Sequence, residues 1–202
     1  LHRVDRRQRQ MCIRDSGLAG LALTTGSFNV AIGKAALAAE DGDGKNVAVG
    51  YAALETQNAG ADAYNVAVGF NAGNAITTGV QNTIVGGSAG NAMTTGQQNV
   101  ISGYAAGLAL TTGSSNVAIG TQALSVEDTT GKNVAIGYQT LKVANRSSDA
   151  HNVAIGYQAG LAITTGLENI VVGALAGDAL TTGGYNVAIG HTALGTEDAG
   201  GR

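Results

Sequence analysis

The pentapeptide NVAIG at residues 29–33 returns, as NVAIG or NVAVG, at 46–50, 65–69, 116–120, 133–137, 152–156 and 186–190. Related pentapeptides fill the gaps between these copies, so the chain can be aligned on one recurring asparagine. Asn29 and Asn46 are 46 − 29 = 17 apart in the numbering, and Asn46 and Asn65 are 65 − 46 = 19 apart. A catalytic site needs different residues at different places, so this degree of repetition is typical of a structural array.

Every repeat begins with an asparagine and has a glycine four residues later. The asparagines are Asn29, Asn46, Asn65, Asn82, Asn99, Asn116, Asn133, Asn152, Asn169 and Asn186. The glycines are Gly33, Gly50, Gly69, Gly86, Gly103, Gly120, Gly137, Gly156, Gly173 and Gly190. Stacked asparagines can hydrogen-bond their neighbours, and glycine suits tight turns. We therefore expect both sets to be structural ladders.

The period predicts an all-β fold. A repeat of this length is too short for a two-helix repeat or a propeller blade, but it suffices for one coil of a parallel β-roll or β-solenoid. Frequent Gly, Val, Ile and Thr also disfavour helix. We expect about ten coils of 17–19 residues, stacked about 4.8 Å apart, with the chain being a fragment of a longer array.

The strand is expected at the three residues after each asparagine. Its first and third residues, such as Val30 and Ile32, share one face and are predicted to point into the coil. The middle residue, such as Ala118, would then point outward, although it is apolar in every repeat. A strand that is apolar on both faces is normally covered on both. A neighbouring chain is the simplest cover, which predicts an oligomer.

A second pattern predicts a packed interior. Some repeats have Leu eight residues after the asparagine and Glu, Gln or Ala at the eleventh position, whereas the others have Gly at the eighth and Ile, Met or Leu at the eleventh. We call these Leu-type and Gly-type coils. Each coil thus supplies one large side chain, never two, as volume compensation in a core requires.

Residues 1–16 share nothing with the repeats. The stretch RRQRQMCIRDS at residues 6–16 resembles the translation of a sequencing adapter, so we interpret 1–16 as a disordered, non-native scar and 17–202 as one repeat domain. A native basic arm that binds nucleic acid or an anionic membrane is the alternative.

The segment 1–16 contains five of the 11 Lys and Arg residues, two of the 14 Asp and Glu residues and the single cysteine. The repeats therefore carry 6 − 12 = −6 charges and no cysteine. This composition disfavours nucleic-acid binding and excludes disulfides and thiolate metal sites from the repeats.

No motif in the repeats indicates catalysis, a metal or a cofactor. GGSAG at residues 86–90 matches a nucleophile elbow, but Ser88 occupies an ordinary repeat position without a strand–turn–helix context. EDGDGK at 40–45 fails the calcium-loop pattern, and we interpret it as an acidic turn, with a weak cation site at Asp41 and Asp43 as the alternative. The motif NRS at 145–147 indicates only an exposed loop.

Two surface patterns could carry binding. Aromatic residues follow the repeat glycine at Tyr51, Phe70, Tyr104, Tyr138 and Tyr157. They could contact sugars, although packing against a neighbouring chain is the favoured interpretation. Threonine pairs such as Thr94 and Thr95 recur in register in the Gly-type coils and the Leu-type coils interrupt this array, which leaves an ice-binding solenoid as a further alternative.

The motifs NVAIGYQA and TTGxxNVAIG resemble the head repeats of trimeric autotransporter adhesins of the YadA-like kind, and they are equally similar to repeats of bacteriophage tail fibres. The resemblance covers residues 17–202 and implies a narrow β-roll packed as a homotrimer on a bacterial surface or a virion. It implies a non-enzymatic, extracellular adhesive fibre that attaches to a host glycan or matrix protein, without membrane insertion of this segment. The 17-residue period is longer than is usual for such heads.

Overall fold

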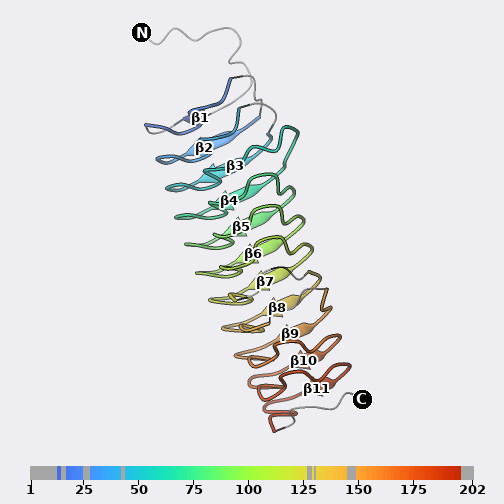
Figure 1. Cartoon of the computed structure of the whole chain (residues 1–202). Helices are drawn as coiled ribbons and strands as arrows, with labels where there is room; N and C mark the ends of the chain where they lie inside the picture. The colour runs from blue at the N-terminus through green and yellow to red at the C-terminus, as the bar shows by residue number, and fades with distance from the viewer. Residues whose placement is uncertain are drawn as a thin grey trace.

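The computed structural model describes residues 13–14, 17–24, 28–41, 44–126, 129, 131–144 and 149–196. These residues form strands, turns and bends but no helix, and they wind into a parallel β-solenoid. The predicted fold class is confirmed. One column of strands runs from the N-terminal to the C-terminal end of the array (Figure 1).

Each coil contributes one short strand to a single parallel sheet. The strands are β1 Ile13–Arg14, β2 Val30–Ile32, β3 Val47–Val49, β4 Val66–Val68, β5 Thr83–Val85, β6 Val100–Ser102, β7 Val117–Ile119, β8 Val134–Ile136, β9 Val153–Ile155, β10 Ile170–Val172 and β11 Val187–Ile189. Their order in the sheet follows their order in the chain. Strand β1 lies within the segment interpreted as a scar and pairs with β2. All other residues of that segment lie outside the described ranges.

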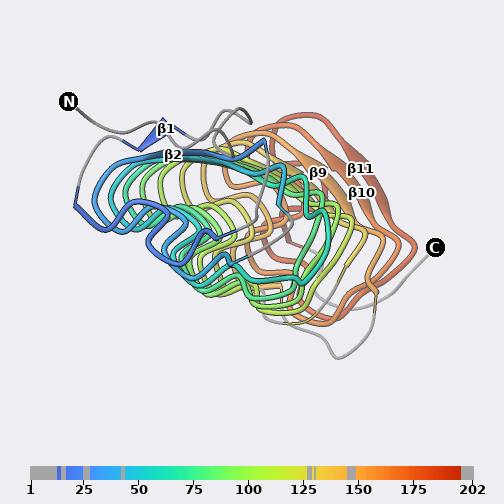
Figure 2. The same ribbon diagram turned by 90° about the horizontal axis from the view of Figure 1, so that it is seen from above.

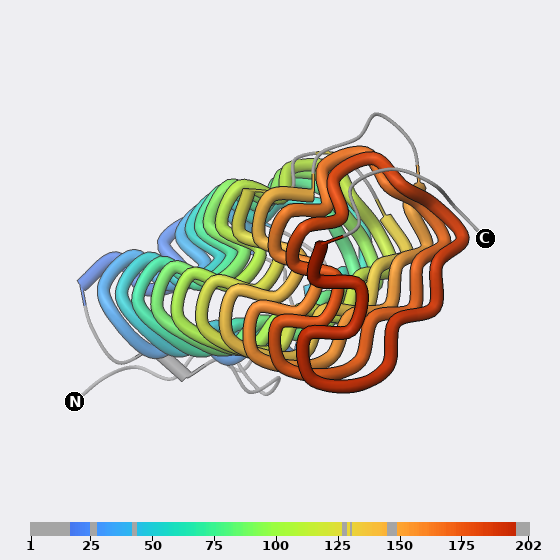
Figure 3. Tube along the Cα trace, turned by 90° about the horizontal axis from the view of Figure 1, so that it is seen from below, coloured from blue at the N-terminus to red at the C-terminus, as the bar shows by residue number. Residues whose placement is uncertain are grey.

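Consecutive strands pair without any shift in register. Ala118 of β7, for example, lies between Ile101 of β6 and Ala135 of β8. The same repeat positions therefore lie above one another along the whole array, as the superposed coils in Figures 2 and 3 show. Equivalent side chains form continuous rows on the surface and in the interior.

The predicted orientation of the strand was wrong. The middle residue points into the solenoid, and Ala31, Ala67 and Ala118 are completely buried. The first and third residues face outward, and Ile119 is 38% exposed. Most middle residues are alanine, and the Val and Ile side chains at the first and third positions lie on the outer face.

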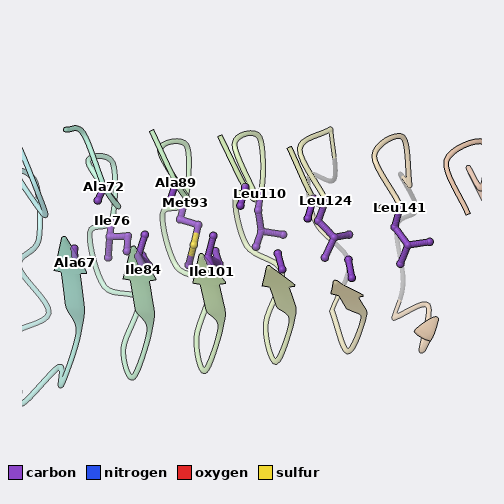
Figure 4. Packing of buried hydrophobic residues seen from close by; sticks show 14 of the residues in the cluster. Ala67, Ala72, Ile76, Ile84, Ala89, Met93, Ile101, Leu110, Leu124 and Leu141 are labelled. Carbon is purple, nitrogen blue, oxygen red and sulfur yellow. The ribbon is translucent and has the colours of Figure 1, made fainter. Parts of the chain in front are cut away.

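The alternation of Leu-type and Gly-type coils fills the interior as predicted. Leu37, Leu54, Leu124 and Leu141 are fully buried in Leu-type coils, as are Ile76, Met93, Leu110, Ile163 and Leu180 in Gly-type coils. Figure 4 shows several of these side chains lying between the strand and the opposite turn of their coils. A Cβ atom at Gly73 would lie about 3.0 Å from Ile76 Cδ1 and 3.1 Å from Leu54 Cδ2, so glycine leaves the space that these side chains occupy.

The prediction of a single large side chain in each coil was too strict. Ile84 and Ile101 are fully buried at the middle strand position, in coils that also bury Met93 and Leu110. These coils have glycine at the eighth position, and a Cβ at Gly90 would meet both Met93 and the two isoleucines within 3.5 Å. The buried volume therefore differs among the Gly-type coils, since the coils that bury Ile76 and Ile163 have alanine at the middle position.

The repeat glycine allows the coils to approach one another. Gly120 has a φ of +127°, and a Cβ there would lie 2.3 Å from the carbonyl oxygen of Gly137 in the next coil. The other repeat glycines that have a coil stacked beyond them show equally short distances, between 2.2 and 2.6 Å. A side chain at this position would push two coils apart, so the spacing of the array depends on glycine here.

We predict that Gly120→Ala strongly destabilises the array, because the methyl group would collide with the carbonyl of Gly137 in addition to straining φ. Gly190 is the matched control, since its φ is +124° but nothing lies within 4 Å of its Cβ position. Gly190→Ala should cost only the strain of about 1–3 kcal/mol. Urea unfolding monitored by circular dichroism measures both, and equal losses in the two variants would contradict the close-approach explanation.

Candidate interaction surface

The repeat asparagines form a buried ladder along the interior. The backbone N–H of each asparagine donates to the side-chain Oδ1 of the asparagine one coil earlier, with nine such bonds of 2.8–3.1 Å from Asn29 to Asn186. The side chains are at most 3% exposed. The ladder ties every coil to its neighbours, and being buried it offers nothing to a ligand.

The asparagine side chain also holds its own coil closed. In Gly-type coils Nδ2 donates to the carbonyl of the turn glycine, as from Asn99 to Gly113 at 2.9 Å. The first two Leu-type coils instead bury a polar side chain at the eleventh position. Asn46 donates to Glu40 Oε2 at 3.3 Å, and Asn65, which follows, donates to Gln57 Oε1 at 3.0 Å. Glu40 and Gln57 are fully buried, so these residues serve the ladder.

We predict that Asn99→Asp destabilises the solenoid by about 3 kcal/mol or more at neutral pH, because it places an uncompensated carboxylate in the interior. The substitution removes the donor to Asn82 Oδ1 at 3.1 Å and to the Gly113 carbonyl. The loss should shrink on acidification, when the buried carboxyl becomes protonated. Exposed Gln98 is the control position, and Gln98→Ala should change the urea midpoint little; equal effects at the two positions would contradict the role of the ladder.

The outward face of the sheet is apolar and free of charge. Strands β2–β11 place two residues each on this face, and all are Val or Ile except Thr83 and Ser102. Several are large and more than one-third exposed, including Val68, Val85, Val100, Ile119, Ile155, Ile170, Val187 and Ile189. We call this set of positions the outward strand face.

Aromatic side chains lie directly beyond one end of the outward strand face. Tyr51 stacks on Phe70 with ring centroids 5.2 Å apart, and Tyr138 stacks on Tyr157 at 5.3 Å. Tyr104 also directly follows its repeat glycine, a place in the coil that we call the rung position. It lies outside these two pairs and is exposed like the others. The five aromatics predicted as surface contacts are therefore all on the surface, in two stacked pairs and one further ring.

Ion pairs lie at the other end of the strands, between each of the two lengthened coils and the lysine that ends the coil before it. Lys45 contacts Asp62 and the hydroxyl of Tyr64, and Lys132 Nζ lies 2.6 Å from Asp149 Oδ2. Hydrogen bonding to Lys45 lowers the pKa of Asp62, and hydrogen bonding to Lys132 lowers the pKa of Asp149. Each bridge therefore contributes above the ordinary carboxyl pKa and is lost as the pH falls through the lowered value. The contribution is small, because these groups are solvent-exposed.

These ion pairs were not anticipated from the sequence. The available signal was an Asp at the same place in both insertions, in ADAY at residues 61–64 and in SDAH at 148–151. Each faces the Lys that directly precedes the asparagine of its own coil.

The motifs weighed for chemistry are dispersed in the structure. Ser88 sits in a repeat turn with a φ of +55°, and its N–H donates to the Phe70 carbonyl at 2.8 Å. Asp41 is exposed, whereas Asp43 and the motif at 145–147 lie outside the described residues. The hydroxyls of Thr77, Thr94 and Thr164 are used internally, as from Thr94 to the Thr111 carbonyl at 3.2 Å.

The described part of the chain has neither a cluster of metal-binding side chains nor a membrane-spanning helix. No cluster of three or more His, Cys, Asp or Glu side chains there is arranged to hold a metal ion. Within the same ranges no helical segment has the length and hydropathy required to cross a bilayer.

No protein-family model matches the sequence, and no curated protein or solved structure is significantly similar to it. The proposed function therefore rests on the geometry of this chain and on the resemblance of its repeats.

Proposed function

We propose that the chain is a non-enzymatic segment of an extracellular surface fibre, and that it assembles as a homotrimer whose repetitive surface mediates attachment. The observation that supports this best is the outward strand face, an uncharged column of Val and Ile that runs along the whole array. Large contiguous apolar patches on a protein surface mark interaction sites. A fibre in which each coil templates the next needs no catalytic residue.

The dimensions of the outward strand face fit contact with further copies of the chain. Ten strands of three residues cover about 10 Å by 48 Å, or about 480 Å². A standard interface buries about 800 Å² per partner. The outward strand face supplies more than half of that area, and the side chains flanking it can supply the rest. Parallel copies with this face turned inward would bury it completely.

The ligand of such a fibre is proposed to be a host glycan or a matrix protein. The repeats carry a net charge of 6 − 12 = −6 over residues 17–202, which disfavours phosphate-rich partners. Contacts repeated in every coil and every chain would add up to useful avidity even where each is weak.

A bacteriophage tail fibre is the alternative setting for the same architecture, on a virion rather than a cell surface. The ice-binding alternative receives less support. Thr77, Thr94 and Thr164 each donate their hydroxyl to a threonine carbonyl of the next coil, so these hydroxyls are already engaged within the solenoid.

We predict that Ile119→Asp yields a folded chain that no longer assembles, because a charge would be placed in the buried contact. Ala118→Asp provides the contrast, since Ala118 is completely buried within its own coil and an aspartate there should disrupt folding itself. Circular dichroism reports the fold, and light scattering reports the mass. A trimer formed by Ile119→Asp would contradict the proposed interface.

The adhesive role predicts binding that depends on assembly. Beads coated with the chain should bind an array of host glycans and matrix proteins, and beads coated with Ile119→Asp at the same density in mass should bind at least tenfold less. Absence of binding by the unmodified chain over the whole array, or equal binding by the two chains, would contradict the proposal.

A further inference from the structure

A longer period is superimposed on the 17-residue repeat. Lys45 and Lys132 are 132 − 45 = 87 residues apart, and so are Asp62 and Asp149. The two stacked aromatic pairs obey the same spacing, since Tyr51 precedes Tyr138 and Phe70 precedes Tyr157 by 87 residues. This spacing comprises four 17-residue steps and one 19-residue step, so the surface is marked once in every five coils.

The outward strand face does not follow this five-coil period. Of its 20 positions only Thr83 and Ser102 differ from Val or Ile. Two such faces that slide past one another by one coil would still bring nine strands against nine, in almost identical surroundings. A uniform apolar face therefore specifies the axial position of its partner only weakly, as in sheets whose register is poorly defined.

The aromatic pairs lie beside the outward strand face, where they can define the axial position of a partner chain. Tyr51 follows Val49, the last residue of β3, by two positions, so their Cα atoms are at most about 7 Å apart. Tyr138 has the same relation to Ile136 of β8. The strand face alone falls short of a standard interface area, and these half-exposed rings continue it directly.

The other rungs at this position differ from the pairs. In chain order the ten rungs are Lys34, Tyr51, Phe70, Gly87, Tyr104, Thr121, Tyr138, Tyr157, Ala174 and His191. A displacement of one coil keeps only one ring of each pair opposite an aromatic ring, and a displacement of two or three coils brings the pairs opposite mainly small, polar or charged residues. Only a displacement of five coils restores the match of one pair with another, and it leaves half of the strands without a partner.

We propose that the stacked pairs Tyr51–Phe70 and Tyr138–Tyr157 fix the axial register between parallel copies of this chain. This inference rests on the proposed assembly. In register the copies end at the same height and the assembly closes. Displaced copies would leave apolar overhangs at both ends, and overhangs recruit further chains into open assemblies.

The first test replaces all four rings by threonine, the residue that Thr121 already provides at the same rung. Native mass spectrometry of the full chain should show one closed oligomer for the unmodified protein and a ladder of larger masses for the variant. Tyr104→Thr is the matched control and should keep the single mass, because Tyr104 is a 64% exposed ring on the same rung outside the pairs. Circular dichroism confirms that each variant is folded.

The second test moves the pairs instead of removing them. Tyr51→Thr with Gly87→Tyr, and Tyr138→Thr with Ala174→Tyr, shift both pairs by one coil, and Tyr104→Thr is added because that ring would otherwise adjoin the first shifted pair. A mixture of this chain with isotopically labelled unmodified chain, unfolded and refolded together, should sort into separate homo-oligomers. Statistical mixing of the two chains would overturn the proposal.

The remaining outcomes are also decisive. A single unchanged mass for the fourfold threonine variant would overturn the register role and leave the rings available to another ligand, with the oligomer intact. A folded but monomeric variant would show that the rings provide affinity rather than register. A monomeric unmodified chain would overturn the proposed assembly itself, and the register inference with it.

Discussion

The contact between one coil and the next is the constraint on which the rest of this structure depends. In each pair of stacked coils, a Cβ atom built on the repeat glycine would lie 2.2–2.6 Å from the carbonyl group of the repeat glycine in the next coil. The backbone amides of each coil donate to the adjacent coil, as from Val117 to the Asn133 carbonyl at 2.8 Å. A single coil therefore satisfies few of its own polar groups, and the array becomes stable only by stacking.

The stacking also explains an unusual backbone. Many residues other than glycine adopt positive φ, including Leu37 at +50°, Lys45 at +52° and Ala52 at +53°. Such conformations are disfavoured for residues with a Cβ atom. They recur at the same positions in each coil, because the hydrogen bonds to the adjacent coils and the asparagine ladder hold the corners in place. Local strain is thus offset by contacts that no isolated coil could make.

The sequence was sufficient to predict the architecture, because a 17-residue period with frequent glycine and β-branched residues leaves few alternatives. It also predicted which of the eighth and eleventh positions fills the core, since Leu54 and Ile76 replace one another in adjacent coils.

The sequence did not predict which face of the strand points inward. Alternation in a strand defines two faces but not their orientation, and the usual assumption that bulky β-branched residues are buried was wrong here. The informative residue was Ala, which occupies the middle position in seven of the ten repeats and is the residue found there in every coil with leucine at the eighth position.

The contacts between surface side chains were the least predictable feature, because the pairing of Lys45 with Asp62 depends on the path of an inserted corner. The stacking of Tyr51 on Phe70, in contrast, follows from register alone and was within reach once the coils were aligned.

A regular solenoid solves its folding problem by repeating one coil, and the same repetition creates a recognition problem. Almost every coil presents the same apolar strand on its outer face, so association through that face would not distinguish one axial position from another. Distinct positions must then come from residues that depart from the repeat. In this chain those departures recur every five coils as the stacked rings and the lengthened corners, while the interior keeps its uninterrupted pattern of asparagine and glycine. The asparagine and glycine that stack coil on coil stay uniform, and the stacked rings vary on the surface where separate chains would meet.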